Sequence, residues 1–506
     1  MRIGIPREAD TGQTLVAGTP ASVTKLIKLG YDVVVEQGAG DIADFPDHQY
    51  EAAGATIGSA DDVWSSDIVT ALDRPAPDRL DAMHDDAVLI ARLNVRLDES
   101  IVPELHDRKL VGLSMDAVPR ISRAQSMDVL SSMANVAGYR AVVEAASAFG
   151  RLFTGQVTAA GKMPPAHIYV IGAGVAGLSA IGTANAMGAV VKATDVRPEV
   201  AEQIESMGAE FVALPTAQEK SSDGYAKALD EDQEKVAQEL YASVAKDSDI
   251  VITTAQIPGR PAPLLLTAEA VEAMKPGSVI VDMAGGNCEL TKPGEQFVTD
   301  NGVTIIGYTD LAGRLPAQAS QLYAQNLVHL LTLMTPEKDG ELAFDLDDDV
   351  VRGITLTKGD DILWPPPPIQ VSAAPSVPTT SEPTVVVEEH HGVAWSTIGL
   401  VVGFIIALAI IFASPTMMLT NYVVLALAVV LGFYVIGNVT PTLHTPLMSF
   451  TNALSGIVVT GAITQLATSE TTLPKIIAWI AIVVASFNVI GGFAVTDRML
   501  DMFKKD

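Results

Sequence analysis

The segment from residue 167 to residue 195 restricts the fold more than any other part of the chain. An apolar run at residues 167–171 predicts a buried parallel strand, and it leads directly into glycines with the spacing GxGxxG. In such a turn the small residues let the backbone approach a pyrophosphate, and the amides of the following helix face the phosphates. The turn residues concerned are Gly172, Gly174, Val175 and Gly177. They predict a Rossmann-type lobe that binds a dinucleotide.

An acidic residue, Asp195, ends the next β-branched run, about twenty residues after the turn, as this fingerprint expects. Its carboxylate can accept both hydroxyls of a ribose and would repel a 2′-phosphate, which favours NAD over NADP. Arg197 could soften that preference, or it could be a solvated surface arginine. The choice of cofactor therefore depends on both residues.

The strand pattern predicts an α/β fold with two doubly wound lobes. Apolar runs alternate with helical patterns through the N-terminal two thirds of the chain, which is typical of parallel sheets. We expect strands at residues 33–36, 68–72, 88–91, 110–115, 210–214, 250–255, 278–283 and 303–308. We assign residues 1–140 to the first lobe, completed by about residues 318–360, and residues 141–317 to the second. Helices at residues 124–151 and 318–333 would join the lobes, and a ligand would lie in the cleft between them.

The C-terminal region has a different character. Residues 364–392 form a Pro-rich linker that cannot build a core, and residues 393–506 predict a transmembrane domain of about four helices. The apolar stretches lie at residues 396–413, 422–437, 454–467 and 475–495. The first and last are long enough to cross ~30 Å of hydrocarbon. The third is short and rich in small residues, so we expect it to be enclosed by its neighbours or to be re-entrant.

Charge and cysteine content exclude several classes of partner. The formal net charge of −28 lies upstream of residue 393, because the charges beyond it cancel. Such acidity argues against nucleic acid or anionic lipid as the partner of the soluble region. Cys288 is the only cysteine, which excludes an intrachain disulfide and a cysteine-based metal cage, and we expect no metal site. The N-terminus opens on a strand-like run without a signal peptide, so we expect the soluble part to fold in the cytoplasm.

A polar segment at residues 119–131 places arginines, an amide, a carboxylate and hydroxyls just ahead of a helix. Taken alone, it could be a capped helix start with solvated charges. Together with other motifs it resembles the α subunits of proton-translocating NAD(P) transhydrogenases. The motifs that carry the resemblance are residues 2–8, 120–131, 137–140, 172–177, 194–199, 285–289 and, in the membrane region, 438–448.

The resemblance implies hydride transfer between NAD(H) on this chain and NADP(H) on a separate β subunit, coupled to proton passage across a bacterial inner membrane. The chain would be multi-pass, with its soluble domain in the cytoplasm. The expected partners are the β subunit, a second copy of the soluble domain and the lipid bilayer. The membrane stretches contain no carboxylate, so we expect the main proton-handling residue on the β subunit. His444 could be a proton relay or an interfacial loop residue, and Asn438 and Thr440 are similarly open.

The resemblance also implies roles for particular residues. The loop that positions the nicotinamide and its ribose is matched by Arg120, Gln125, Ser126, Met127 and Asp128, with Ser131 nearby. Contacts to the adenosine ribose are matched by Asp195, Val196 and Arg197, and a mobile loop that closes over the nucleotide is matched by Gly224 and Tyr225. Hydride transfer between two nicotinamides requires orientation rather than a general acid or base, and amides, hydroxyls and an Arg/Asp pair suit that task.

The chain departs from the family pattern at two places. The strand end at residues 281–284 abuts Gly285 directly, where family members carry extra residues, and this shortened turn lies beside the predicted cleft. Leu15 stands where an arginine is usual.

Two other functions remain open. A membrane-anchored, alanine-dehydrogenase-like oxidoreductase would share the two-lobed fold, but it needs a cationic anchor, a lysine and a histidine. The matching positions hold Leu15, the lysine-free residues 70–75, and Asn94. A non-catalytic membrane protein that senses NADH would keep Asp195 and the glycines, but the presence of Arg120, Gln125 and Asp128 counts against it.

Overall fold

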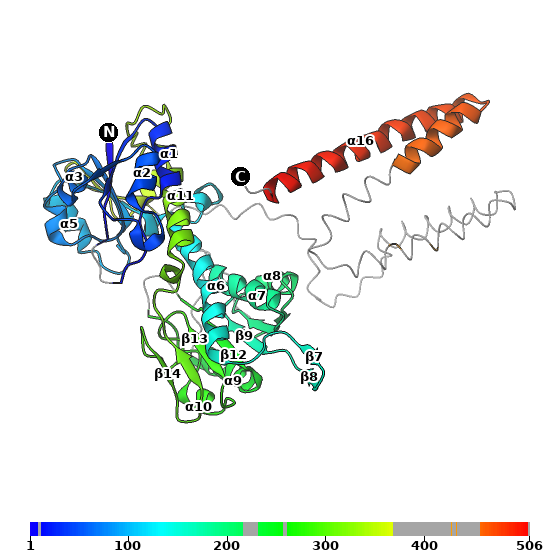
Figure 1. The fold of residues 1–506 in the computed structure, drawn as a ribbon, viewed down its shortest axis with the longest axis horizontal. Coiled ribbons are helices and arrows are strands. Elements are labelled where there is room, and N and C mark those ends of the chain that lie inside the picture. The colour runs from blue at the N-terminus through cyan, green and yellow to red at the C-terminus, as the bar shows by residue number, and fades with distance from the viewer. Residues whose placement is uncertain are drawn as a thin grey trace, which may run out of the picture. The chain divides into compact units, whose positions relative to one another are not determined.

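The computed structural model describes residues 1–8, 12–215, 231–256, 261–367, 427, 432 and 456–503. The chain divides into two compact units, Met1–Thr379 and Thr380–Asp506. The first unit contains two α/β lobes, each built on its own large sheet (Figure 1). The predicted α/β fold with two doubly wound lobes is confirmed.

The first lobe has an eight-stranded sheet in the order β17-β16-β6-β5-β4-β1-β2-β3. Its strands are parallel from β6 to β3, whereas β16 and β17 pair antiparallel at one edge. The bounds are β1 Arg2–Ile5, β2 Asp32–Glu36, β3 Thr56–Gly58, β4 Ile68–Asp73, β5 Val88–Arg92, β6 Val111–Ser114, β16 Thr355–Lys358 and β17 Asp361–Ile362. The strands predicted in this lobe are all present, while β3, β16 and β17 were not predicted.

The second lobe has a seven-stranded sheet in the order β11-β10-β9-β12-β13-β15-β14, parallel except for β14. The bounds are β9 His167–Ile171, β10 Val190–Thr194, β11 Glu210–Phe211, β12 Ile250–Thr253, β13 Val279–Asp282, β14 Gln296–Val298 and β15 Thr304–Ile306. The strand order reverses at β9, and a crevice for a ligand forms beyond the carboxyl ends of the strands at such a point. The glycine turn therefore lies at the switch point of the sheet.

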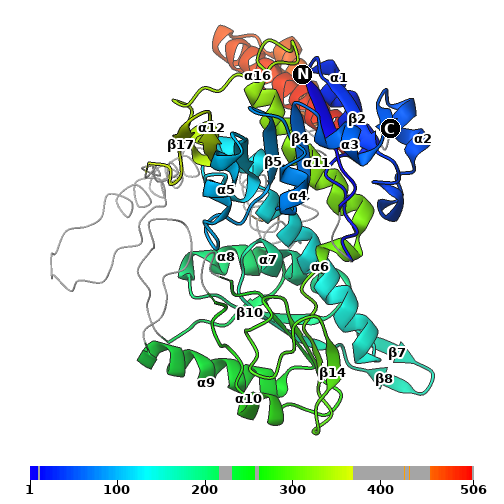
Figure 2. The same ribbon diagram turned by 90° about the vertical axis from the view of Figure 1, so that its left-hand side faces the viewer.

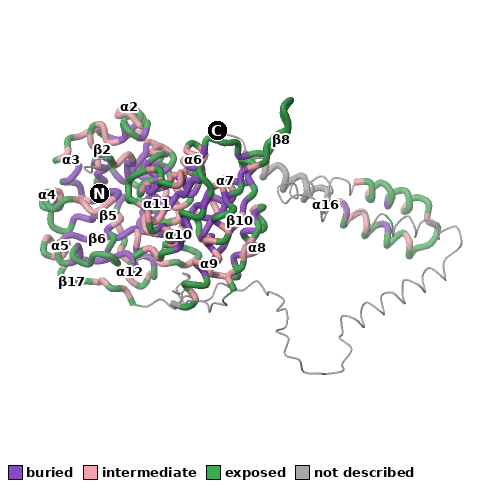
Figure 3. The backbone as a smooth tube through the Cα atoms, turned by 90° about the horizontal axis from the view of Figure 1, so that it is seen from below, coloured by how far each residue is buried: buried purple, intermediate pink, exposed green. Residues whose placement is uncertain are grey.

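Helices cover both faces of each sheet, which explains why the central strands are apolar throughout rather than alternating. In the first lobe these helices are α1 Pro20–Lys28, α2 Asp47–Ala52, α3 Ala60–Trp64, α4 Pro77–Leu80, α5 Ile101–Asp107 and α12 Asp349–Ile354. In the second lobe they are α7 Val175–Ala186, α8 Ala201–Ser206, α9 Glu231–Asp247 and α10 Ala268–Glu272. The strands of both sheets are mostly buried (Figure 3).

Two long helices, α6 Val129–Phe149 and α11 Pro316–Met334, join the lobes and pack against each other (Figure 2). Val129 and Val136 of α6 lie in the core of the first lobe, and Ala141 and Phe149 lie in the core of the second. The prediction that α6 begins at residue 124 was wrong. Residues Ser122–Met127 form a 3-10 turn (η3), and Asp128 caps the helix that follows.

A two-stranded hairpin, β7 Gln156–Thr158 and β8 Gly161–Met163, was not predicted. All of its strand residues are exposed, as Figure 3 shows for β8. No periodic pattern of apolar residues marks it in the sequence, because neither of its faces is buried.

The second unit contains a helix at residues 456–468 and α16 Thr472–Phe503. Ala462 and Ala478 are buried, and both line a space between these helices. Among the described residues, no helix combines the length and the hydropathy needed to cross a bilayer. The predicted linker from residue 368 onward and nearly all of the first two predicted spans lie outside the described residues.

Candidate functional site

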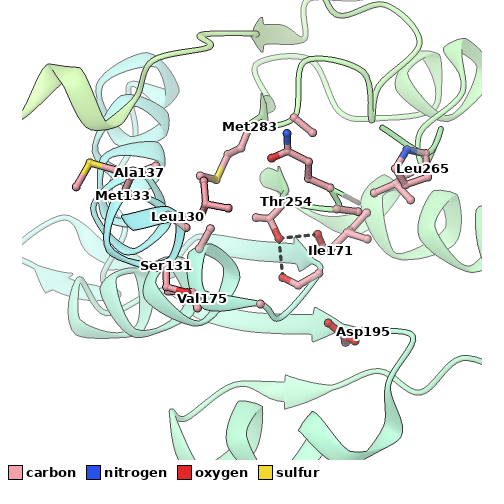
Figure 4. Close-up of a pocket in the computed structure, with 18 of the residues that line it drawn as sticks. Leu130, Ser131, Met133, Ala137, Ile171, Val175, Asp195, Thr254, Leu265 and Met283 are labelled. Carbon is pink, nitrogen blue, oxygen red and sulfur yellow. Dashed lines mark hydrogen bonds between the residues drawn. The ribbon is translucent and has the colours of Figure 1, made fainter. Parts of the chain in front are cut away.

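A cavity of about 620 Å³ lies between the two lobes. Its second-lobe wall is the glycine turn together with the loops that follow β10, β12 and β13, and part of its first-lobe side is α6. Figure 4 shows Leu130, Ser131 and Met133 on α6, Val175 beside Ser131, and Thr254 and Asp195 further along the second-lobe wall. The volume falls within the range usual for cofactor and small-molecule sites.

The three glycines of the turn have different steric environments. At Gly172 the backbone has φ +98°, and a Cβ atom would lie 2.6 Å from Thr254 Oγ1; at Gly177 it would lie 1.9 Å from the carbonyl oxygen of Gly172. Gly174, by contrast, has no atom within 4 Å of its Cβ position, and it lines the cavity. The fold thus requires glycine at positions 172 and 177, whereas it imposes no such requirement at Gly174.

Asp195 is buried at the end of β10, and the protein itself uses the acceptor positions of its carboxylate. Oδ1 accepts from the backbone N–H of Arg197 at 2.9 Å and from its Nε at 2.9 Å. Oδ2 accepts from the Ala173 N–H at 2.7 Å and from Arg197 Nη2 at 3.0 Å. A carboxylate offers about four lone-pair positions, so ribose hydroxyls must displace some of these donors.

Arg197 is therefore not the solvated surface arginine that the sequence left open. Its side chain is 29 % exposed and paired with Asp195, and this hydrogen bonding raises the pKa of the guanidinium. Asp195, Val196 and Arg197 all line the cavity. Tyr241 lies in the same wall, and burial raises its pKa to about 12, which keeps its hydroxyl neutral.

The residues matched to the nicotinamide loop are only partly brought into the cavity. Arg120 and Ser131 line it, whereas Gln125, Ser126, Met127 and Asp128 are not among the lining residues. The carboxylate of Asp128 caps α6, accepting from the Ser131 N–H at 2.9 Å and its hydroxyl at 2.6 Å. Met127 is 5 % exposed and packs in the first-lobe core, and its assignment to the cofactor stays a prediction.

The shortened turn at Ala284–Gly285 is held by a buried carboxylate. Asp282 Oδ1 accepts from the N–H groups of Ala284 at 3.1 Å and Gly285 at 3.0 Å, and Oδ2 accepts from Cys288 N at 3.1 Å. The amide of Asn287 donates to the carbonyls of Ala255 and Pro263, at 2.9 and 2.8 Å. The turn is thus closed and hydrogen-bonded.

Sequence reasoning missed several residues of the cavity, among them Arg92, Arg96, Tyr241, Thr254, Met283 and Asp310. Thr254, Met283 and Asp310 follow the carboxyl ends of β12, β13 and β15, where an α/β sheet is expected to bind its ligand. Their positions in the sequence could therefore have predicted that they line the cavity. Arg92 forms an ion pair with Asp73 at 2.8 Å. No sequence pattern marked Tyr241 on α9.

Some predicted residues lie outside the described residues: Gly224, Tyr225, Asn438, Thr440 and His444.

Within the part of the chain that is described, no group of His, Cys, Asp and Glu residues could hold a metal ion. Cys288 is buried, and burial raises the pKa of its thiol.

The fold and the cavity define a class, the two-lobed proteins with one Rossmann-type dinucleotide site at their junction. Family models place the chain within that class. Residues 4–137 match the alanine dehydrogenase/PNT N-terminal domain, residues 141–365 match the corresponding C-terminal domain, and residues 421–505 match the 4TM region of pyridine nucleotide transhydrogenase.

Relatives narrow the class further. The NAD(P) transhydrogenase subunit alpha of Haemophilus influenzae is 49 % identical and that of Cereibacter sphaeroides 47 %, each over the whole of both chains. A crystal structure of transhydrogenase from Sinorhizobium meliloti covers 72 % of this chain and 99 % of its own, with 42 % identity and a TM-score of 0.63. The chain belongs to the family of NAD(P) transhydrogenase α subunits.

Alanine dehydrogenases are more distant relatives. Alanine dehydrogenase 2 of Staphylococcus aureus is 29 % identical over 71 % of this chain and 94 % of its own length. The transhydrogenase α subunits, in contrast, match the C-terminal region as well. The resemblance found in the sequence is confirmed.

Proposed function

We propose that the chain binds NAD(H) in the cavity between its lobes and exchanges hydride with NADP(H) held by a β subunit. The observation that carries the proposal is Gly174, which the fold leaves free of neighbours and which lines the cavity. A pyrophosphate fits against such a backbone, beside the N-terminus of α7. Asp195 and Arg197 lie where the adenosine ribose would be bound.

The nicotinamide, when bound, supplies the hydride, and the protein supplies orientation. Arg120 and Ser131, on the first-lobe side, are proposed to hold that end of the cofactor, with Gln125, Ser126 and Asp128 reaching it as the lobes close. Gly224 and Tyr225 are proposed to close over the nucleotide.

The described lining of the cavity supports direct hydride exchange over amino-acid oxidation. It includes no histidine and no lysine, and Asn94 lies at the first-lobe wall where an alanine dehydrogenase would need acid–base chemistry. Hydride exchange between two nicotinamides requires no such group.

We further propose that residues 393–506 cross the bacterial inner membrane about four times, with the soluble domain in the cytoplasm, and that the β subunit contributes the main proton-handling residue. Self-association of the soluble domain is part of the same proposal. Because hydride and protons would travel in different places, coupling has to be conformational.

The test is hydride transfer and proton movement in vesicles that hold the full chain with or without its β subunit. We expect NADH to reduce thio-NADP and to move protons only when both subunits are present. Reductive amination of pyruvate with ammonia, driven by NADH and independent of the β subunit, would support the alanine-dehydrogenase alternative instead. NADH binding without either reaction would support a sensor.

A further inference from the structure

One face of α11 carries buried polar side chains that contact separate segments of the first lobe. Ser320, Tyr323 and Asn326 are spaced three residues apart, so they share a face of the helix. Ser320 and Tyr323 are fully buried and Asn326 is 5 % exposed. Since a core helix is most stable with apolar residues on such a face, these polar groups call for an explanation.

Each of the three side chains hydrogen-bonds to backbone. Ser320 Oγ accepts from Val16 N at 3.0 Å, and the Tyr323 hydroxyl donates to the carbonyl of Ala71 at 2.9 Å. Asn326 Nδ2 donates to the carbonyl of Ser126 at 2.7 Å. Because a carbonyl oxygen can only accept, chemistry fixes the orientation of the Asn326 amide.

The Asn326 contact is the one that reaches the cavity wall. Ser126 lies in η3, between Arg120, which lines the cavity, and Asp128, which caps α6 and holds Ser131. The helix that carries Asn326 begins one residue after η5 Ala312–Arg314, and Ala312 lines the same cavity. Asn326 thus links η3 to the chain segment that comes from the second lobe.

Folding stability does not account for this amide. Asn326 Oδ1 is buried and has no hydrogen-bond partner, which destabilises the folded state. The partner of the Asn326 amide nitrogen, Ser126, is an exposed residue of η3 rather than a residue of the core. A leucine of similar volume would avoid the unpaired acceptor, and Leu327 and Leu330 beside it are already part of the first-lobe core.

Besides the packing of Ala124 and Met127 in the core, η3 has a second polar contact, and it is weaker. Arg123 pairs with Asp348, the N-cap of α12, but the Arg123 side chain is 47 % exposed, and such a pair is screened by water and salt. The buried Asn326 contact is not screened in this way.

We propose that Asn326 is a positioning residue for hydride transfer: its amide fixes η3, and through it Arg120 and the Asp128–Ser131 cap, at the nicotinamide end of the cavity. This inference rests on the proposed function. Asn326 itself does not line the cavity, so it acts only through the loop that it holds.

The test compares Asn326→Leu with Tyr323→Phe in the full chain, reconstituted with its β subunit. The matched control also removes a buried hydrogen bond from α11, but one that ends on β4 rather than on η3. For Asn326→Leu we expect the kcat of hydride transfer from NADH to thio-NADP to fall at least about tenfold, the effect of a small misplacement of reacting groups. ADP-ribose, which lacks the nicotinamide, should bind with unchanged affinity, and the melting temperature should not fall. Tyr323→Phe should keep the wild-type kcat.

Asn326→Asp provides a second readout that keeps the shape of the side chain. Its carboxyl group can donate to Ser126 only while protonated, so activity relative to wild type should decline as the pH rises through the pKa of the new carboxyl. A flat ratio over pH, a wild-type kcat for Asn326→Leu, or a parallel loss of ADP-ribose binding would overturn the inference. If the wild-type chain itself failed to bind NADH, the proposed function would fail instead.

Discussion

At the residue scale, the proposed contact of Asp195 with the adenosine ribose depends on how Asp195 is paired with Arg197. Four protein donors occupy the carboxylate, three of them from Arg197. A ribose therefore competes with the guanidinium for Asp195. We expect the displaced guanidinium to lie close to the 2′ position, where it would attract a phosphate.

We predict that Arg197→Ala increases the preference for NADH over NADPH by about tenfold, the size of one charge-assisted contact. NADH should bind at least as tightly as in wild type, because two side-chain donors no longer compete for Asp195. NADPH should bind more weakly, because its 2′-phosphate no longer has the Arg197 guanidinium as a partner. Titration of each nucleotide measures the ratio, and an equal loss of both affinities would contradict this account.

The sequence predicted the identity of these residues but not their pairing. The fingerprint located Asp195 from its distance to the glycine turn, because backbone geometry fixes that distance. Whether Arg197 points to solvent or to the carboxylate depends on side-chain packing. The spacing of residues along the sequence does not show that packing. The family resemblance assigned Met127 to the cofactor, and that resemblance does not show that its side chain lies in the core.

At the scale of elements, the contact between α6 and α7 sets the position of α7, the helix that we propose faces the phosphates. At Gly138 of α6 a Cβ atom would lie 2.1 Å from the carbonyl oxygen of Ala176. Ser179 of α7 donates to the carbonyl of Asn135 at 2.7 Å. The first turn of α7, which faces the cavity, is therefore held directly against the helix that joins the lobes.

We predict that Gly138→Ala destabilises the protein by about 1–3 kcal/mol, since backbone atoms cannot yield to the added methyl group. Its affinity for NADH should fall as well, because α7 is pushed away from α6. The matched control is Gly182→Ala in α7, where the new methyl group would meet only the flexible end of Met207. Urea unfolding and NADH titration of both variants test the prediction, and equal behaviour of the two would contradict it.

The elements of the fold were predictable to the extent that they are buried on both faces. The parallel strands of both sheets were found because they are continuous apolar runs. The strands β3, β14, β16 and β17 and the hairpin β7–β8 were missed, since short or exposed strands leave little periodicity. The start of α6 was misplaced because η3 has the composition of a helix but its backbone turns at Asp128.

At the scale of the whole molecule, the proposed function needs a way to transmit free energy between the cavity of the first unit and the region that matches the 4TM family model. Moving one proton charge across 100 mV provides about 2.3 kcal/mol. That is enough to shift the ratio of reduced NADP to reduced NAD by more than tenfold. The sequence predicted this organisation through composition and family motifs.

We predict that an imposed potential in vesicles with both subunits shifts that product ratio at least about tenfold per 100 mV and proton transferred. An uncoupler should return the ratio to its value in detergent without abolishing hydride exchange. If the uncoupler left the product ratio unchanged, the prediction that this chain couples hydride transfer to proton movement would be contradicted.

The central claim is that the cavity beside Gly174 holds the pyrophosphate of NAD(H), and calorimetry tests it most directly. NADH titrated into the full chain should release or absorb heat with one site per chain. Gly174→Ala should leave the fold intact, because its methyl group meets no protein atom within 4 Å, yet it should weaken binding by at least about tenfold. Gly461→Ala, whose methyl group also meets no protein atom within 4 Å, is the control in the second unit. No heat with the wild-type chain, or wild-type affinity in Gly174→Ala, would contradict the claim.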